Sequence, residues 1–96
     1  MATDETKTGY DPRPVAEVLE QLIEQNPAEH ILQFFRFGHL QGHLREASET
    51  FARVAAELVG NIPRNAERTV ALRKLLEGKD AAVRAVLAAR SPASPA

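Results

Sequence analysis

Hydrophobic residues recur at helical spacing in three stretches of the chain, and the first stretch begins at Pro14. Its apolar positions follow the i, i+3, i+4, i+7, i+8 spacing of one helix face and are Val15, Val18, Leu19, Leu22 and Ile23. The pattern predicts a short helix over residues 14–26, ended by Asn26 and Pro27. Asn26 also precedes Glu29 by three residues, which resembles a capping box, so we expect a further short turn over residues 27–35.

A second and a third stretch predict two longer helices. After a break at Gly38, spacings of four and three alternate in a seam of coiled-coil type formed by Leu40, Leu44, Ala47, Phe51, Val54 and Leu58. This seam predicts a helix over about 39–59, which the segment 60–63 ends. Another helix is expected over about 65–89, capped by Asn65. Its inward-facing residues are expected to be Leu72, Leu75, Leu76, Val83, Val86 and Leu87.

These elements predict an all-α fold, because no stretch shows the alternation of a strand. A short loop makes two long helices antiparallel neighbours, so we expect a short N-terminal helix followed by a long antiparallel helical hairpin. One helical domain is expected over 14–90, with disordered segments at 1–13 and 91–96, which are polar or rich in proline and serine. The hairpin alone does not cover both apolar seams, so we expect oligomerisation through them.

Charge is unevenly distributed along the chain, although the formal net charge is only -1. Residues 1–33 contain seven Asp/Glu and two Lys/Arg, whereas residues 34–96 contain six Asp/Glu and ten Lys/Arg. The second part favours an anionic partner, although such a surplus is also typical of a solvated helix face. The chain has no cysteine, no signal-peptide pattern and no apolar run of transmembrane length, so we expect a cytoplasmic protein without a membrane partner.

Polar side chains in the third predicted helix allow two interpretations. Lys79 occupies a place in the apolar stripe, so either its stem carries the ammonium out to water or the ammonium faces a shared cavity. A polar stripe beside it consists of Arg73, Glu77, Asp80 and Arg84. These residues form either a ladder of exposed ion pairs or a phosphate-binding set in which the two acids hold Arg84 and Lys79 in place.

Motifs for metal binding or catalysis are weak or missing. His39 and His43 lie four residues apart with Glu46 a turn further on, but two histidines and one carboxylate are weak evidence, and no metal site is predicted. The sequence has no HExxH motif, no phosphate-cradling glycine loop and no GxSxG motif, so it gives no positive argument for an enzyme. We expect no catalytic residue and no cofactor.

Three of the four phenylalanines stand close together, at Phe34, Phe35 and Phe37, with Arg36 among them. One interpretation is a hydrophobic staple that packs the short helix onto the hairpin. The other is a platform on which a nucleobase stacks while neighbouring cations meet its phosphates. The sequence alone leaves both interpretations open.

The aromatic segment, the helix with "LREASETFARVAAELV", the proline loop and "ERTVALRKLLEGKDAAVRA" together resemble the phage anti-CBASS cyclic-nucleotide sponge family. The similarity covers roughly residues 34–88. It implies a small phage protein whose helical hairpin assembles as hexamers built from dimers. Such proteins sequester the cyclic dinucleotides and cyclic trinucleotides that bacteria use as antiviral alarms. They bind these messengers without cleaving them, in pockets at subunit boundaries.

The same resemblance implies which residues bind the ligand. Phe37 falls on the position of the stacking aromatic, and His39 on the polar residue after it. Arg53 matches the basic residue in the middle of the first long helix. Arg84 is the counterpart of the arginine near the end of the last helix, and Lys79 lies about one turn before it.

The expected function is therefore immune evasion by a sponge in the host cytoplasm, which lowers the free concentration of a cyclic nucleotide and so antagonises CBASS signalling. The alternative is a small helical protein–protein interaction module without a small-molecule ligand. Convergence of Phe37, Lys79 and Arg84 across a subunit boundary would favour the sponge. DNA or RNA is not expected as a partner, because the first third of the chain is acidic and no concentrated basic run occurs.

Overall fold

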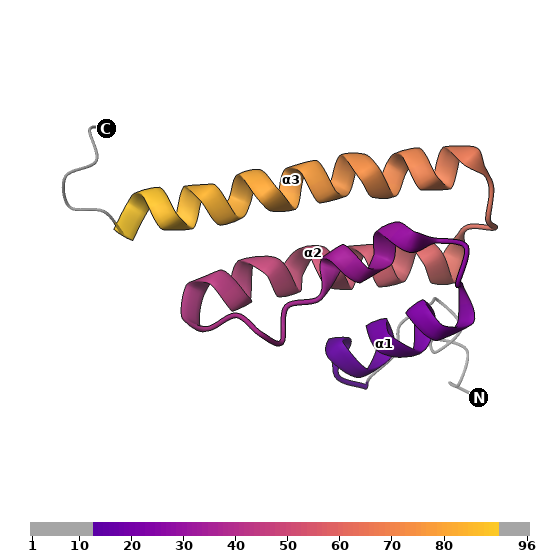
Figure 1. Ribbon diagram of the computed structural model, residues 1–96, viewed down its shortest axis with the longest axis horizontal. Coiled ribbons are helices and arrows are strands. Elements are labelled where there is room, and N and C mark those ends of the chain that lie inside the picture. The colour runs from indigo at the N-terminus through magenta and orange to yellow at the C-terminus, as the bar shows by residue number, and fades with distance from the viewer. Residues whose placement is uncertain (1–12, 91–96) are drawn as a thin grey trace, which may run out of the picture.

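The computed structural model describes residues 13–90 and contains only helices and their connections within that range (Figure 1). Helix α1 spans Val15–Gln25, the 3-10 helix η2 spans His30–Phe35, α2 spans Gly42–Asn61 and α3 spans Ala66–Arg90. The all-α prediction is confirmed for the described residues. Apart from residue 13, the segments predicted to be disordered lie outside this range. None of the helices between residues 13 and 90 is long and apolar enough to span a bilayer.

Helix α2 occupies the centre of the fold. It packs against α3 and against α1, and η2 contacts all three of these helices. Figure 1 shows α2 and α3 running in opposite directions, with α1 on the side of α2 away from α3. The core therefore lies around α2, and its most deeply buried hydrophobic side chains are Leu19, Leu32, Phe35, Phe37, Ala52, Ala55 and Leu72.

Hydrogen bonds fix both ends of α1. The Pro14 carbonyl accepts the N–H groups of Glu17 and Val18 at 3.0 and 3.1 Å, so the helix begins directly after the proline. At the other end, the Leu22 carbonyl accepts both the backbone N–H and the side-chain amide of Asn26, each at 2.9 Å. Asn26 therefore caps the C-terminus of α1, and the helix is one residue shorter at each end than predicted.

The capping box predicted from Asn26 and Glu29 does not form. Neither side chain caps η2, because Asn26 is bound to the end of α1 and the Glu29 carboxylate is bound to Arg68 of α3. A short 3-10 helix nevertheless forms within the segment where a turn was expected. Its buried side chains are Ile31, Leu32 and Phe35, so packing takes the place of the missing cap.

Helix α2 begins at Gly42, about three residues later than predicted. A turn precedes it, closed by the Leu40 N–H on the Phe37 carbonyl at 3.0 Å, and Gly42 has a φ of 58°, which other residues rarely adopt. The buried face also differs from the predicted seam, since Val54 is 38% exposed and the buried positions are Ser48, Ala52, Ala55 and Val59. Because α2 is packed by several elements, the positions between its two contact faces are buried most deeply.

Helix α3 begins as predicted, with the Asn65 side-chain oxygen accepting the backbone N–H of Arg68 at 2.8 Å. Leu72 is fully buried, as expected of an inward-facing residue. Leu87 was also expected to face inward, but it is 48% exposed. Figure 1 shows that the C-terminal end of α3 extends beyond the start of α2.

Candidate functional site

A groove of about 280 Å³ lies between α3 and the segment that connects η2 to α2. The connecting segment contributes His39 and Leu40, and α3 contributes one face made of Lys79, Asp80, Val83 and Arg84. Three residues that the resemblance placed in the ligand site, His39, Lys79 and Arg84, therefore line the same groove, although His39 is distant in sequence from the other two.

An ion pair anchors the connecting segment to α1. Arg36, directly after η2, donates from Nε to Glu20 Oε2 at 2.7 Å and from Nη2 to Glu20 Oε1 at 2.9 Å. These hydrogen bonds are the largest effect on the pKa of Glu20 and, together with the charge of the guanidinium, they hold it below its ordinary value although burial opposes them. Two parallel N–H···O bonds fix orientation as well as distance, so the pair positions the segment that carries His39.

The Lys79 side chain reaches from α3 to the end of η2. Its Nζ donates a hydrogen bond to the Phe34 carbonyl at 2.6 Å. Carbonyls in the last turn of a helix lack partners within the helix, so a cation is favourable there. The ammonium is therefore bound to a backbone carbonyl beside the groove, in a contact that is exposed to water. An ammonium has three N–H donors, so two remain for a ligand.

Arg84 and Asp80 are exposed, and neither has an ion-pair partner among residues 13–90. The ladder of ion pairs, which was one of two interpretations of this stripe, is thus absent from the described part of the chain, and Glu77 Oε1 instead lies 3.8 Å from Lys74 Nζ. The Arg84 guanidinium can therefore donate parallel N–H groups to an external anion without first breaking an ion pair.

The three clustered phenylalanines differ sharply in exposure. Phe35 is 0% and Phe37 is 2% exposed, so both belong to the core, whereas Phe34 is 57% exposed. Phe37 also lies beneath Arg45, whose guanidinium carbon is 5.7 Å from the ring centroid. Protein atoms therefore cover most of the Phe37 ring, and stacking of a base on Phe37 stays a prediction. The staple interpretation fits Phe35 and Phe37 but not Phe34.

Two other residues singled out in the sequence lie outside this groove. Arg53 is exposed on α2, and its guanidinium is 3.6 Å from the Glu49 carboxylate. His43 Nδ1 lies 3.0 Å from Glu46 Oε1, so these two side chains pair with each other. Within the described range, no group of three or more His, Asp or Glu side chains is arranged to hold a metal ion.

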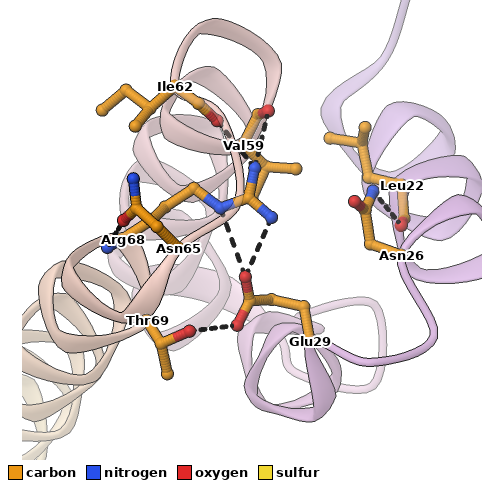
Figure 2. A network of polar contacts seen from close by, with 8 residues as sticks. All are labelled: Leu22, Asn26, Glu29, Val59, Ile62, Asn65, Arg68 and Thr69. Atoms are coloured by element: carbon orange, nitrogen blue, oxygen red, sulfur yellow. Dashed lines mark hydrogen bonds and ion pairs between the residues drawn. The ribbon is translucent and has the colours of Figure 1, made fainter.

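A buried ion pair that was not foreseen from the sequence joins η2 to α3 (Figure 2). Nε and Nη2 of Arg68 donate to Glu29 Oε1 at 3.2 and 2.9 Å, and Thr69 Oγ1 donates to Glu29 Oε2 at 2.7 Å. The side chains of Arg68 and Glu29 are only 3% and 2% exposed. Arg68 Nη1 also donates to the Val59 and Ile62 carbonyls at 3.3 and 2.7 Å. One arginine thus connects η2, the end of α2 and the start of α3.

Opposing effects act on the pKa of Glu29. Burial is the largest single effect and raises the pKa, but hydrogen bonds from Thr69 and Arg68 and the charges of Arg68 and Arg64 together outweigh it. The pKa therefore lies below its ordinary value of 4.5, and the carboxylate is ionised at neutral pH. The sequence offered one signal for this pair, because Arg68 stands four residues before Leu72, on the inward-facing stripe of α3.

The groove combines groups that suit an anionic ligand with a planar part. Lys79 and Arg84 offer N–H donors, and Leu40 and Val83 offer apolar walls. Lys79 also donates to the backbone carbonyl of Phe34, whose ring is exposed. In comparisons with known proteins, no family model, no curated protein and no solved structure matches the chain.

Proposed function

We propose that this protein is a phage sponge for cyclic dinucleotides and cyclic trinucleotides, which it binds without cleaving in the host cytoplasm and so withdraws from CBASS signalling. The observation that carries the proposal is the groove lined by His39, Lys79 and Arg84. The resemblance of residues 34–88 to the sponge family assigns the same three residues to the ligand site. The other two residues that the resemblance assigns to the ligand site, Phe37 and Arg53, do not line this groove.

Each part of the groove suits a part of a cyclic nucleotide. The remaining N–H groups of Lys79 and the guanidinium of Arg84 can donate to the oxygens of a phosphodiester, and the ring of His39 can donate one more hydrogen bond. Leu40 and Val83 provide an apolar wall for a ribose or a base. The negative charge of Asp80 offsets one of the two positive charges of Lys79 and Arg84. The affinity must therefore come from the shape of the ligand as well as from its negative charge.

A sponge must bind tightly relative to the concentration of the signal. A dissociation constant in the nanomolar range corresponds to about -12 kcal/mol. One groove at the surface of a single chain offers few contacts for such an affinity, so we propose that a second copy closes it within a hexamer built from dimers. Arg53, which lies outside the groove of its own chain, would then reach the ligand from the neighbouring copy.

Nucleotide capture tests this function directly. The purified protein is incubated with a panel of cyclic dinucleotides and trinucleotides and removed by filtration, and the filtrate is assayed before and after the retained protein is denatured. Depletion followed by recovery of intact nucleotide is expected. Recovery of a linear product would identify a phosphodiesterase instead, and no depletion across the panel would contradict nucleotide binding.

Arg84→Ala should weaken nucleotide binding by about tenfold or more, because a hydrogen bond to a charged group contributes about 1.5–3 kcal/mol. Arg73→Ala is the matched control, since Arg73 is exposed on the same helix but does not line the groove. Calorimetric titration measures both affinities, and circular dichroism checks that both variants fold. Equal affinities of the two variants would remove Arg84 from the site.

A protein–protein interaction module is the second candidate. Several apolar side chains remain exposed on the described surface, with exposures of 38, 37, 47 and 48% for Val54, Ile62, Val70 and Leu87. Single exposed apolar residues are common on folded proteins, so this observation carries less weight than the groove. A module of this kind would deplete no nucleotide, and it would bind its protein partner equally well with Arg84→Ala.

A further inference from the structure

Phe34 is the exposed member of the aromatic cluster, and its backbone carbonyl accepts a hydrogen bond from Lys79, which lines the groove. We propose that Phe34, and not the buried Phe37, is the ring on which a base of the bound cyclic nucleotide stacks. The proposal rests on the nucleotide-binding function proposed above, and it assigns to that site a residue that the resemblance did not name.

The first argument is exposure. Stacking needs an aromatic face that a ligand can cover, and Phe34 is 57% exposed whereas Phe37 is 2% exposed. Phe37 could offer such a face only if the connecting segment left the core. That segment is held at Arg36, whose Nε and Nη2 lie 2.7 and 2.9 Å from the Glu20 carboxylate. Phe34 can receive a base without any of these contacts being broken.

The second argument is the position of the Phe34 backbone. Its carbonyl oxygen lies 2.6 Å from Lys79 Nζ, so the residue that carries the ring directly contacts a cation that lines the groove. The base and the phosphate of one nucleotide are separated by a single ribose. A nucleotide whose phosphate meets the remaining N–H groups of Lys79 can therefore place its base on the neighbouring Phe34 ring.

The chemistry of the ring defines what this contact contributes. A phenylalanine ring has no hydrogen-bonding group, and every base has a π-face, so stacking of this kind tolerates both purines and pyrimidines. Loss of one such contact lowers affinity by about 5- to 150-fold. Phe34 should therefore add affinity for all cyclic nucleotides that bind in the groove, without selecting among their bases.

The absence of tryptophan from the sequence allows an optical test. Phe34→Trp keeps a stacking ring and introduces the single tryptophan of the chain. Titration with cyclic di-AMP and with cyclic UMP–AMP should change its fluorescence, with saturation at the concentrations at which calorimetry detects binding. Val70→Trp is the control, because Val70 is 47% exposed on the same chain and does not line the groove. Its fluorescence should not respond to either ligand.

Phe34→Ala measures the contribution of the ring to affinity. We expect a loss of about 5- to 150-fold for both ligands, with unchanged helix content because the ring lies outside the core. Phe37→Leu keeps an apolar side chain in the core and should bind both ligands like the wild-type chain.

The outcomes separate this assignment from the proposed function. Wild-type affinity of Phe34→Ala, combined with weakened binding by Arg84→Ala, would overturn the role of Phe34 and leave the sponge function in place. Loss of affinity in Phe37→Leu alone would return the stacking role to Phe37. No binding of either ligand by the wild-type chain would overturn both proposals.

Discussion

Arg68 carries a full positive charge on a side chain that is 3% exposed. The negatively charged side chain of Glu29 is 2% exposed. Removing such ions from water costs several kcal/mol each, so their attraction and their hydrogen bonds must offset that cost. The carbonyls of Val59 and Ile62 contribute two of these hydrogen bonds, and Thr69 contributes another. Loss of one charge would leave the other buried without a partner.

Arg68→Ala should therefore lower the free energy of unfolding by about 3–5 kcal/mol, because the carboxylate of Glu29 would remain buried and unpaired. Urea unfolding followed by circular dichroism measures this change. Arg73→Ala is the control, since Arg73 is exposed, and its effect should stay within about 0.5 kcal/mol.

A double replacement separates the charge from the packing. Arg68→Met combined with Glu29→Leu leaves no buried charge, so it should be much closer to wild type in stability than Arg68→Ala. If Arg68→Ala unfolds at the same urea concentration as the wild-type chain, the buried pair does not contribute as described.

Glu29 should also make stability depend on pH. Its pKa in the folded chain lies below 4.5, the ordinary value expected in the unfolded chain, so the unfolded state takes up the proton first as pH falls. The stabilisation is complete above about pH 4.5 and is lost as pH falls through the lower folded-state pKa. Thermal unfolding at a series of pH values should show a larger drop in Tm below about pH 5 for the wild-type chain than for the Arg68→Met, Glu29→Leu double variant. Identical pH profiles would argue against ionised Glu29 in the folded state.

At the scale of whole elements, the start of α2 depends on a backbone conformation and not on a side-chain cap. Gln41 precedes the helix without a side-chain cap, and Gly42 has a φ of 58°. A side chain at this φ brings Cβ close to the following carbonyl oxygen. The connecting segment therefore needs glycine at this position to turn from η2 into α2.

Gly42→Ala should destabilise the fold by about 1–2 kcal/mol, the cost of the left-handed conformation for a residue with a side chain. Gly60→Ala is the matched change in the same helix, because a Cβ at Gly60 meets nothing within 4 Å and its φ is not positive. Gly60→Ala should stabilise by up to about 1 kcal/mol through helix propensity. Thermal melts of the two variants should shift in opposite directions, and a shared direction would contradict the strain at Gly42.

Helix positions were predicted more accurately than the faces that the helices bury. The alternating seam in α2 included Val54, which is 38% exposed, and omitted Ser48, which is fully buried. Ser48 is a polar residue, so the sequence pattern did not place it in the core, and its Oγ has no hydrogen-bond partner among the described residues. A small side chain is buried there because α2 has neighbours on more than one side. Hydrophobicity along one helix does not specify that arrangement.

At the scale of the whole molecule, the C-terminal end of α3 extends beyond the start of α2 and leaves an apolar side chain exposed (Figure 1). Leu87 is 48% exposed near this end of α3. Apolar residues in this position are suited to contact with a second copy, which the proposed oligomer requires. Assembly through this end would also explain why an apolar stripe continues past the core.

Leu87→Glu should therefore convert the proposed oligomer into smaller species, because a charge at an apolar contact between copies is costly to bury. Sedimentation velocity measures the size of each variant. Ala81→Glu places the same charge at another exposed position of α3 and should leave the assembly unchanged. A wild-type chain that sediments as a monomer would contradict the assembly itself.

Part of the candidate site was predictable and part was not. The resemblance named His39, Lys79 and Arg84, which line one groove, but it also named Phe37, which is buried, and Arg53, which lies elsewhere. Phe34 and Phe37 have the same side chain and similar neighbours in sequence, so no local pattern distinguishes the exposed ring from the buried one.

The sequence by itself determined that the fold of the described residues is helical and approximately where its three α-helices begin and end, because apolar spacing, proline and a capping residue such as Asn65 act over three or four residues. Only the tertiary structure decided which residues meet across the fold. The pairing of Arg68 with Glu29, the contact of Lys79 with the Phe34 carbonyl and the burial of Phe37 depend on how α1 and η2 lie against α2 and α3. These contacts join residues far apart in the chain, and their energies arise only when packing removes water from between them.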